Sequence, residues 1–279
     1  MFPFGPAYQG EHYQPFYWRG THGSALLVHG FPGHPGDMRA IATHLHDKGW
    51  TVDVPLLPGF GSQIEHLPEY RYEDWLAATR SHLGKLIANN QRPNVLVGYS
   101  MGGAISMAMA ADFDIDALIL FAPFWRIEHM LWRMLPALKW FVPTFKPAEL
   151  LRINLDDETF QAGLREIIPG VDFADPTTRS SMESFRLPTH VIDQVRVAGQ
   201  NGHANAANIT VPTLIVQGTR DDLAEARLTR KLADELSAPV TYVEVDCDHA
   251  LLEDSQTCWP QVIEAVDAFI DMYHLGSTR

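Results

Sequence analysis

Basic residues and cysteines are scarce in this sequence, and each scarcity excludes a class of protein. The 21 lysines and arginines stand against 34 aspartates and glutamates, which gives a formal net charge of −13. Nucleic-acid binding needs clustered basic residues to neutralise phosphates, so no nucleic-acid partner is expected. The same charge predicts mild repulsion of anionic substrates such as fatty-acid salts. The two cysteines, Cys247 and Cys258, are too few for a disulfide framework and form no C-x-x-C metal pattern.

Long hydrophobic runs are also missing. No stretch of about 18 apolar residues occurs, so the sequence predicts no membrane-spanning helix. The segment from Met1 to Pro6 lacks the basic end and apolar stretch of a secretory signal. We therefore expect a cytoplasmic enzyme. With 279 residues, of which 46% are hydrophobic, the chain can form one large domain with an insertion.

Strands and helices are predicted to alternate along most of the chain. Short apolar runs bounded by turn residues predict strands at 25–28, 50–54, 95–97, 117–121, 213–217 and 240–245. Apolar residues at helical spacing predict helices at about 38–47, 74–89, 222–236 and 258–272. This alternation is typical of an α/β fold, a parallel sheet covered by helices, with reactive groups at the carboxyl ends of the strands.

The interval between Pro123 and Pro212 breaks the alternation, because its 88 residues contain no convincing strand. We expect a core formed by residues 1–123 and 212–279, with residues 124–211 as a helical cap over the strand ends. Helical patterns are present in two parts of this interval, near 157–167 and 188–198.

Three tryptophans lie within 16 residues near the start of this insertion, at Trp125, Trp132 and Trp140. Two interpretations of this apolar stretch remain open. Its side chains either pack the cap against the core, or form an acyl-binding surface or a weak interfacial contact. Three basic residues interrupt the stretch, which excludes insertion into a membrane but not docking on a surface.

The pentapeptide Gly98-Tyr99-Ser100-Met101-Gly102 lies between a predicted strand and a helical stretch of small residues. G-x-S-x-G in this context is the pattern of a nucleophile elbow, although a glycine-rich turn can contain serine by coincidence. The turn is so tight that the serine takes strained dihedrals and the flanking positions have no room for a Cβ. The hydroxyl then lies at a helix N-terminus, which favours the negative charge that develops during acyl transfer.

A serine nucleophile needs a base and an acid, and in this fold both follow later strands. His249 lies in the turn after the strand predicted at 240–245, where the base is required. Asp221 and Asp222 both follow the strand at 213–217 and compete for the acid role. That role is to fix the imidazole tautomer and to stabilise the imidazolium.

Two backbone amides are expected to bind the oxyanion. One belongs to Met101, the residue after the nucleophile. The other should come from the turn His29-Gly30-Phe31-Pro32 after the first strand. Pro32 has no N–H, so Phe31 is the best placed donor, and Pro32 also restricts the backbone of Phe31. We expect His29 to hydrogen-bond the loop rather than to react. This chemistry needs no metal and no organic cofactor.

These motifs resemble those of the α/β-hydrolases, and among them the bacterial carboxylesterases and monoacylglycerol lipases. The resemblance covers most of the chain outside residues 124–211 and implies the α/β-hydrolase fold. It places the acid three residues after Gly218, which selects Asp221. The residues that carry it are Pro15-Phe16-Tyr17, Leu26-Leu27-Val28-His29-Gly30-Phe31, Gly98-Tyr99-Ser100-Met101-Gly102-Gly103, Gly218-Thr219-Arg220-Asp221 and His249-Ala250-Leu251-Leu252-Glu253-Asp254.

The sequence therefore predicts a serine hydrolase for small-molecule carboxylic esters with a neutral, moderately apolar acyl chain. Phe31, Phe60, Trp125 and Trp132 are expected to line the acyl side. Other chemistries could use the same triad: carbon–carbon bond hydrolysis, aminopeptidase activity or cofactor-free perhydrolysis. A binding protein that kept the fold and lost catalysis is a further alternative, and the presence of all three triad residues counts against it. The oligomeric state does not follow from the sequence.

Overall fold

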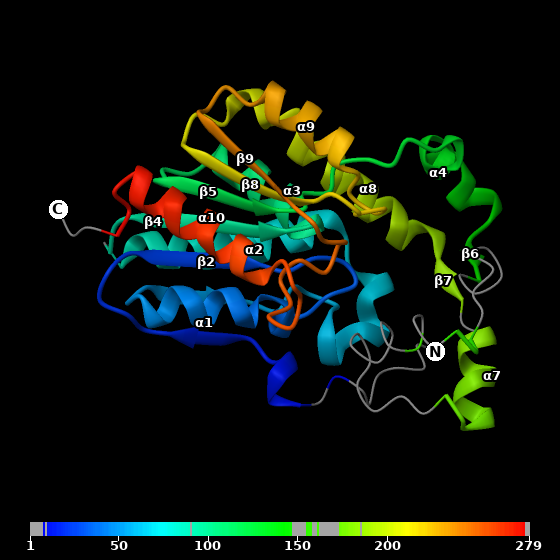
Figure 1. The fold of residues 1–279 in the computed structure, drawn as a ribbon. Helices are drawn as coiled ribbons and strands as arrows, with labels where there is room; N and C mark the ends of the chain where they lie inside the picture. The colour runs from blue at the N-terminus through cyan, green and yellow to red at the C-terminus, as the bar shows by residue number, and fades with distance from the viewer. Residues whose placement is uncertain are drawn as a thin grey trace.

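A seven-stranded sheet forms the centre of the molecule (Figure 1). The computed structural model describes residues 8, 10–89, 91–146, 155–157, 161, 173–184 and 186–276. The strand order is β1-β3-β2-β4-β5-β8-β9, and every pairing is parallel except that of β1 with β3. The strands are β1 (Phe16–Trp18), β2 (Ser24–Val28), β3 (Thr51–Val54), β4 (Asn94–Tyr99), β5 (Ala117–Phe121), β8 (Thr213–Gly218) and β9 (Val240–Val245).

Helices cover both faces of this sheet (Figure 1). One face carries α1 (Arg39–Asp47) and α10 (Trp259–Met272). The other face carries α2 (Tyr72–Ala88), α3 (Met101–Ala110), α8 (Thr189–Ala204) and α9 (Ala226–Glu235). Short 3-10 helices are η2 (Glu11–Tyr13), η3 (Pro35–Met38), η4 (Gly61–Glu69) and η5 (Ala206–Asn208).

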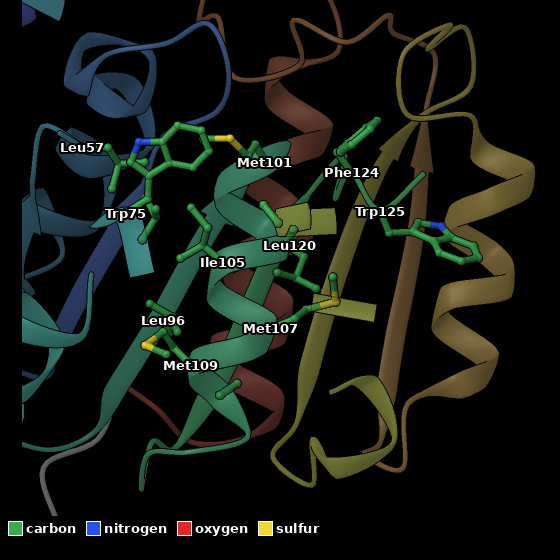
Figure 2. Close-up of a cluster of buried hydrophobic side chains, with 14 of the residues drawn as sticks. Leu57, Trp75, Leu96, Met101, Ile105, Met107, Met109, Leu120, Phe124 and Trp125 are labelled. Atoms are coloured by element: carbon green, nitrogen blue, oxygen red, sulfur yellow. The ribbon is translucent and has the colours of Figure 1, made fainter. Parts of the chain in front are cut away.

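The buried core explains why the central strands have continuous apolar sequences. Strands β2, β5 and β8 are buried at every residue, because helices cover them from both sides. Helix α3 is buried along its whole length. Figure 2 shows Trp75 of α2, Met101 and Ile105 of α3, and Leu96 of β4 gathered on one face of the sheet. This packing fixes α3, and with it the turn that precedes α3.

The insertion between β5 and β8 contains α4 (Met130–Phe141), β6 (Thr144–Phe145), α7 (Pro176–Ser184), β7 (Leu187–Pro188) and α8. Helix α8 packs closely on α3, since a Cβ added at Gly202 would lie 2.5 Å from the carbonyl oxygen of Ala104. Helices α4 and α7 lie to one side of the sheet (Figure 1). The predicted helix at 188–198 is thus confirmed, while the helical pattern at 157–167 falls mostly outside the described residues.

The structure differs from the sequence-based expectations at the short strands, at the start of α9 and in the pairing of the two cysteines. Strand β1 was not predicted, and β6 pairs with β7 where no strand was expected, because runs of two or three residues are too short to show a periodicity. Helix α9 begins at Ala226 rather than near residue 222. Cys247 and Cys258 form one disulfide, with their Cα atoms 6.0 Å apart. In the described part of the chain, no helix is both long and apolar enough to cross a membrane.

Candidate active site

Ser100 occupies the sharp turn between β4 and α3, with φ 54° and ψ −119°. A positive φ is rare for a residue with a Cβ and costs on the order of 1–3 kcal/mol. Neighbouring glycines make the turn possible. A Cβ at Gly98 would lie 2.6 Å from the carbonyl oxygen of Gly102, and one at Gly102 would overlap the carbonyl oxygen of Val28. The glycine spacing that predicted a strained turn therefore has the expected steric cause.

The structure brings Ser100, His249 and Asp221 together from three separate strand ends. His249 Nε2 lies 3.0 Å from Ser100 Oγ, and His249 Nδ1 lies 2.7 Å from Asp221 Oδ2. The Asp221 side chain is completely buried, whereas 19% of the His249 side chain is exposed. Because a carboxylate only accepts hydrogen bonds, Nδ1 carries the proton and Nε2 is free to accept from the serine hydroxyl.

Asp221 is held by the backbone that follows β8. Its Oδ1 accepts hydrogen bonds from the amides of Leu223 and Ala224, both at 2.8 Å. This turn accounts for the late start of α9. The neighbouring Asp222 is exposed to solvent, so only one of the two candidate acids faces His249.

Gln217, in β8, also contacts the carboxylate, and the sequence interpretation missed it. Its Nε2 lies 3.2 Å from Asp221 Oδ2, 2.8 Å from the carbonyl oxygen of Ala224 and 3.1 Å from that of Gly218. Its whole side chain is buried. The signal that could have identified Gln217 is a polar residue near the end of a largely apolar strand.

Tyr99 contacts His249 through both its hydroxyl and its ring. The Tyr99 hydroxyl donates a hydrogen bond of 2.8 Å to the His249 carbonyl oxygen, and the two rings stack with centroids 5.3 Å apart. Burial of this phenol raises its pKa well above the ordinary value, so it stays a neutral donor. Tyr99 occupies the first variable position of G-x-S-x-G, which carried no prediction.

The turn after β2 lies directly against the nucleophile. A Cβ at Gly30 would come within 3.0 Å of Ser100 Cβ and 3.2 Å of the Tyr99 carbonyl oxygen. The Phe31–Pro32 peptide bond is cis. Among the described residues, neither the Phe31 amide nor the Met101 amide donates to a carbonyl or a side chain. Neither amide is therefore committed to another acceptor there, and Met101 lies at the first position of α3, where a helix offers its N–H no acceptor.

His29 is buried and holds this turn in place, which agrees with the expected loop contact. Its Nε2 accepts a 3.1 Å hydrogen bond from the Leu57 amide, and its Nδ1 lies 3.0 Å from the Gly30 carbonyl oxygen. Burial lowers the pKa of His29 to about 4, although the bond to Gly30 opposes this shift. The ring is therefore neutral at neutral pH.

The aromatic residues expected on the acyl side take different positions. Phe60 is fully buried, and its ring lies 5.9 Å from that of Phe31. Trp132 meets the ring of Phe124 edge to face at 5.5 Å, and the Phe124 amide donates to the Ser100 carbonyl oxygen at 3.1 Å.

Trp125 points away from Ser100, toward α8 and α9. Its Nε1 donates to the Leu228 carbonyl oxygen at 3.1 Å, and its ring stacks on His203 at 4.1 Å. Figure 2 shows its ring on the far side of Phe124 from α3. Within the described ranges, no cluster of three or more His, Cys, Asp or Glu side chains could hold a metal ion.

Comparison with known proteins assigns this arrangement to a family. The sequence profile of the alpha/beta hydrolase family matches residues 25–258. A thermostable monoacylglycerol lipase of Bacillus sp. (strain H-257) is 36% identical over 97 residues, which are 35% of this chain and 38% of that protein. A monoacylglycerol lipase of Mycolicibacterium smegmatis is 25% identical over 231 residues, 80% of this chain and 79% of that protein.

Solved structures agree with the fold. The monoacylglycerol lipase of Paleococcus ferrophilus superimposes with a TM-score of 0.66 at 18% identity, covering 93% of this chain and 99% of that one. A structure from a study of the metagenome-derived lipolytic enzymes LipS and LipT gives a TM-score of 0.72 at 19% identity, covering 94% and 98%. The chain spans less than half of the length of three curated relatives: 38% of the Bacillus sp. lipase, 43% of a Bacillus subtilis carboxylesterase and 32% of a Psychrobacter immobilis lipase.

Proposed function

Since the chain belongs to the alpha/beta hydrolase family, we propose that it is a serine hydrolase that cleaves carboxylic esters through an acyl-enzyme on Ser100. The observation that carries the proposal is the continuous hydrogen-bonded series from Ser100 Oγ through the His249 ring to the buried Asp221 carboxylate. A base within hydrogen-bond reach of a strained serine, and an acid behind that base, are the parts that nucleophilic acyl transfer requires.

The proposed reaction has two halves. Ser100 Oγ attacks the ester carbonyl carbon while His249 Nε2 takes its proton. The amides of Phe31 and Met101 stabilise the tetrahedral oxyanion. The bond to the alcohol oxygen then breaks, and His249 gives its proton to the leaving alcohol. Water attacks the acyl-enzyme with His249 again as base, and the acid leaves as the proton returns to Ser100 Oγ.

We assign the acyl group to the apolar side of this site. Phe31 is half-buried beside the nucleophile, and Phe124 and Trp132 lie on the insertion side. Relatives are named monoacylglycerol lipase and carboxylesterase, which supports esters with one apolar acyl chain as the substrate class. Residues 124–211 are proposed to select among these esters, because they supply the contacts on the insertion side.

Replacing Ser100 with alanine tests the proposal. We expect hydrolysis of p-nitrophenyl butyrate to fall by about 10⁶-fold, since the base then has no nucleophile to activate. Ser106→Ala is the matched control, because Ser106 is a buried serine of α3, the helix that follows Ser100, and its hydroxyl has no hydrogen-bond partner among the described residues. A fluorophosphonate probe should label the wild type and Ser106→Ala but not Ser100→Ala. Undiminished turnover by a folded Ser100→Ala protein would refute the assignment.

A further inference from the structure

A cavity lies between the start of the insertion and helix α8. It has a volume of about 860 Å³ and is lined by residues 126–130, by residues 132–134 and by two side chains of α8, Arg196 and Gln200. None of the residues that line it belongs to the series Ser100, His249 and Asp221. Trp132, in its wall, meets the ring of Phe124, whose amide donates a hydrogen bond to the Ser100 carbonyl oxygen.

The charge of this cavity is opposite to that of the chain. Among the described residues that line it are three arginines, Arg126, Arg133 and Arg196, and one carboxylate, Glu128. The whole chain carries a net charge of −13. A cleft lined mainly by positive charges attracts anions locally, even on a protein whose net charge is negative.

The carboxylate of Glu128 is paired both with Arg126 in the cavity wall and with basic residues of α9 outside it. Glu128 Oε2 accepts a hydrogen bond from Arg227 of α9 at 2.8 Å, and Glu128 Oε1 accepts one from Arg126 at 2.6 Å. Lys231 lies 3.9 Å from the same carboxylate. The hydrogen bond from Arg227 is the main cause that lowers the pKa of Glu128, so this group stays ionised and remains shared among three cations.

The arginines keep donors to spare. Arg133 has no side-chain partner in the part of the chain that the structure describes. Arg126 stacks over the Trp125 ring at 4.1 Å, and its buried Nε has no hydrogen-bond partner there. Arg196 uses Nε on Asp193 at 2.7 Å and Nη1 on Gln200 at 2.6 Å. An arginine presents five N–H donors, so unused ones remain on each of the three.

Part of the remaining wall is apolar and adaptable. Trp132, Met130 and Met134 line the cavity, and the two methionines are 73% and 50% exposed. Unbranched methionines fit apolar ligands of different shape. Guanidinium groups recognise carboxylate and phosphate oxygens through paired N–H donors.

We propose that this cavity binds an amphipathic anion, with its carboxylate or phosphate head on the arginines and its apolar tail along Trp132 and the methionines. Binding requires no step at Ser100, so the proposal goes beyond the ester hydrolysis proposed above. One natural source of such a ligand is the carboxylic acid that the proposed reaction releases. The overall charge predicts repulsion of fatty-acid salts, and this cavity is the place where the local charge reverses that preference.

Isothermal titration with decanoate tests the proposal after Ser100 has been blocked with diisopropyl fluorophosphate. We expect one equivalent to bind, and 1-decanol and acetate to bind at least tenfold more weakly, because each lacks one half of the ligand. Arg133→Gln should weaken decanoate binding about tenfold, since it removes a charged donor that holds no other residue. Decyl phosphate, titrated in parallel, identifies the preferred head by the tighter dissociation constant.

Arg230→Gln is the matched control, because Arg230 is an exposed arginine of α9 that pairs with Glu244 and does not line the cavity. It should bind decanoate as the wild type does. Equal binding of decanol and decanoate, unchanged binding by a folded Arg133→Gln protein, or loss of all binding when Ser100 is blocked would overturn the proposal. If the blocking reagent fails to label Ser100, the proposed hydrolysis fails, while the arginine variants still decide whether this cavity binds the anion.

Discussion

The replacement Asp221→Asn gives the sharpest test of how the carboxylate works, because the surrounding hydrogen bonds fix which way the new amide points. The position of Oδ1 must accept the amides of Leu223 and Ala224, both at 2.8 Å, so the asparagine oxygen takes that position. Its NH₂ group then replaces Oδ2, which accepts hydrogen bonds from His249 Nδ1 and Gln217 Nε2 in the wild type.

Two consequences follow from that orientation. The new NH₂ donates to His249 Nδ1, so the ring proton moves to Nε2 and the ring can no longer take the Ser100 proton. The NH₂ also faces Gln217 Nε2, a donor against a donor at 3.2 Å in the present geometry. Gln217 cannot relieve this by turning over, because its oxygen would then face the carbonyl oxygens of Gly218 and Ala224.

We expect kcat to fall by about 10⁴-fold, equivalent to about 5 kcal/mol of transition-state stabilisation, with KM little changed. The lost hydrogen bonds and the opposed donors should lower the free energy of unfolding by about 1–3 kcal/mol. The assay is steady-state hydrolysis of p-nitrophenyl butyrate, with urea unfolding followed by circular dichroism. Asp222→Asn is the matched control, since this neighbouring carboxylate is exposed and should leave both quantities unchanged. The reasoning is refuted if Asp221→Asn retains a tenth of the wild-type kcat, or if Asp222→Asn loses as much.

Three further predictions concern the groups around the site. Tyr99→Phe removes the donor to the His249 carbonyl oxygen but keeps the stacked ring, so kcat should fall only about threefold to tenfold and stability by about 1 kcal/mol, whereas Tyr99→Leu should lower kcat further; equal kcat in both variants would contradict a role for the ring. Gly30→Ala places a Cβ 3.0 Å from Ser100 Cβ and should lower kcat about 10²-fold and slow fluorophosphonate labelling as well, and a wild-type kcat would show that the Phe31 amide has not moved. The pKa of His29 is lowered to about 4 when folded, so the unfolded chain binds a proton below pH 6.5 that the folded chain does not; stability is present above pH 6.5 and about 3 kcal/mol of it is lost as pH falls to about 4. Urea unfolding at pH 7 and pH 4.5 should show a smaller loss for His29→Asn than for the wild type, and an equal loss would exclude His29 as the cause.

The central fold and the meeting of Ser100 with His249 could be predicted because both depend on local patterns. Apolar runs of three to six residues identified the parallel strands, and chain order placed the base after the last of them. The choice between Asp221 and Asp222 could not be made from spacing and composition, since both follow β8; the resemblance selected Asp221, and the turn at Leu223 and Ala224 gives the physical reason.

Other contacts were beyond sequence reasoning because they depend on distant parts of the chain. Gln217 meets Asp221 only because the turn after β8 folds back over the strand end. Trp125 was predicted to line the acyl side because it is one of three tryptophans in the apolar stretch of the insertion, yet its indole donates to a carbonyl oxygen of α9 about a hundred residues later. Strands β6 and β7 have two residues each, which is too few to show alternation.

The hydrogen bond from the Phe124 amide to the Ser100 carbonyl oxygen has a consequence for how such a protein can diversify. The bond joins Phe124, the first residue of the insertion, to Ser100 through backbone atoms of both residues. This hydrogen bond needs only an N–H at position 124, so it excludes proline there and places no demand of its own on the side chain. Segments of very different sequence can be grafted after this position and inherit the same attachment point, while the serine keeps its backbone geometry.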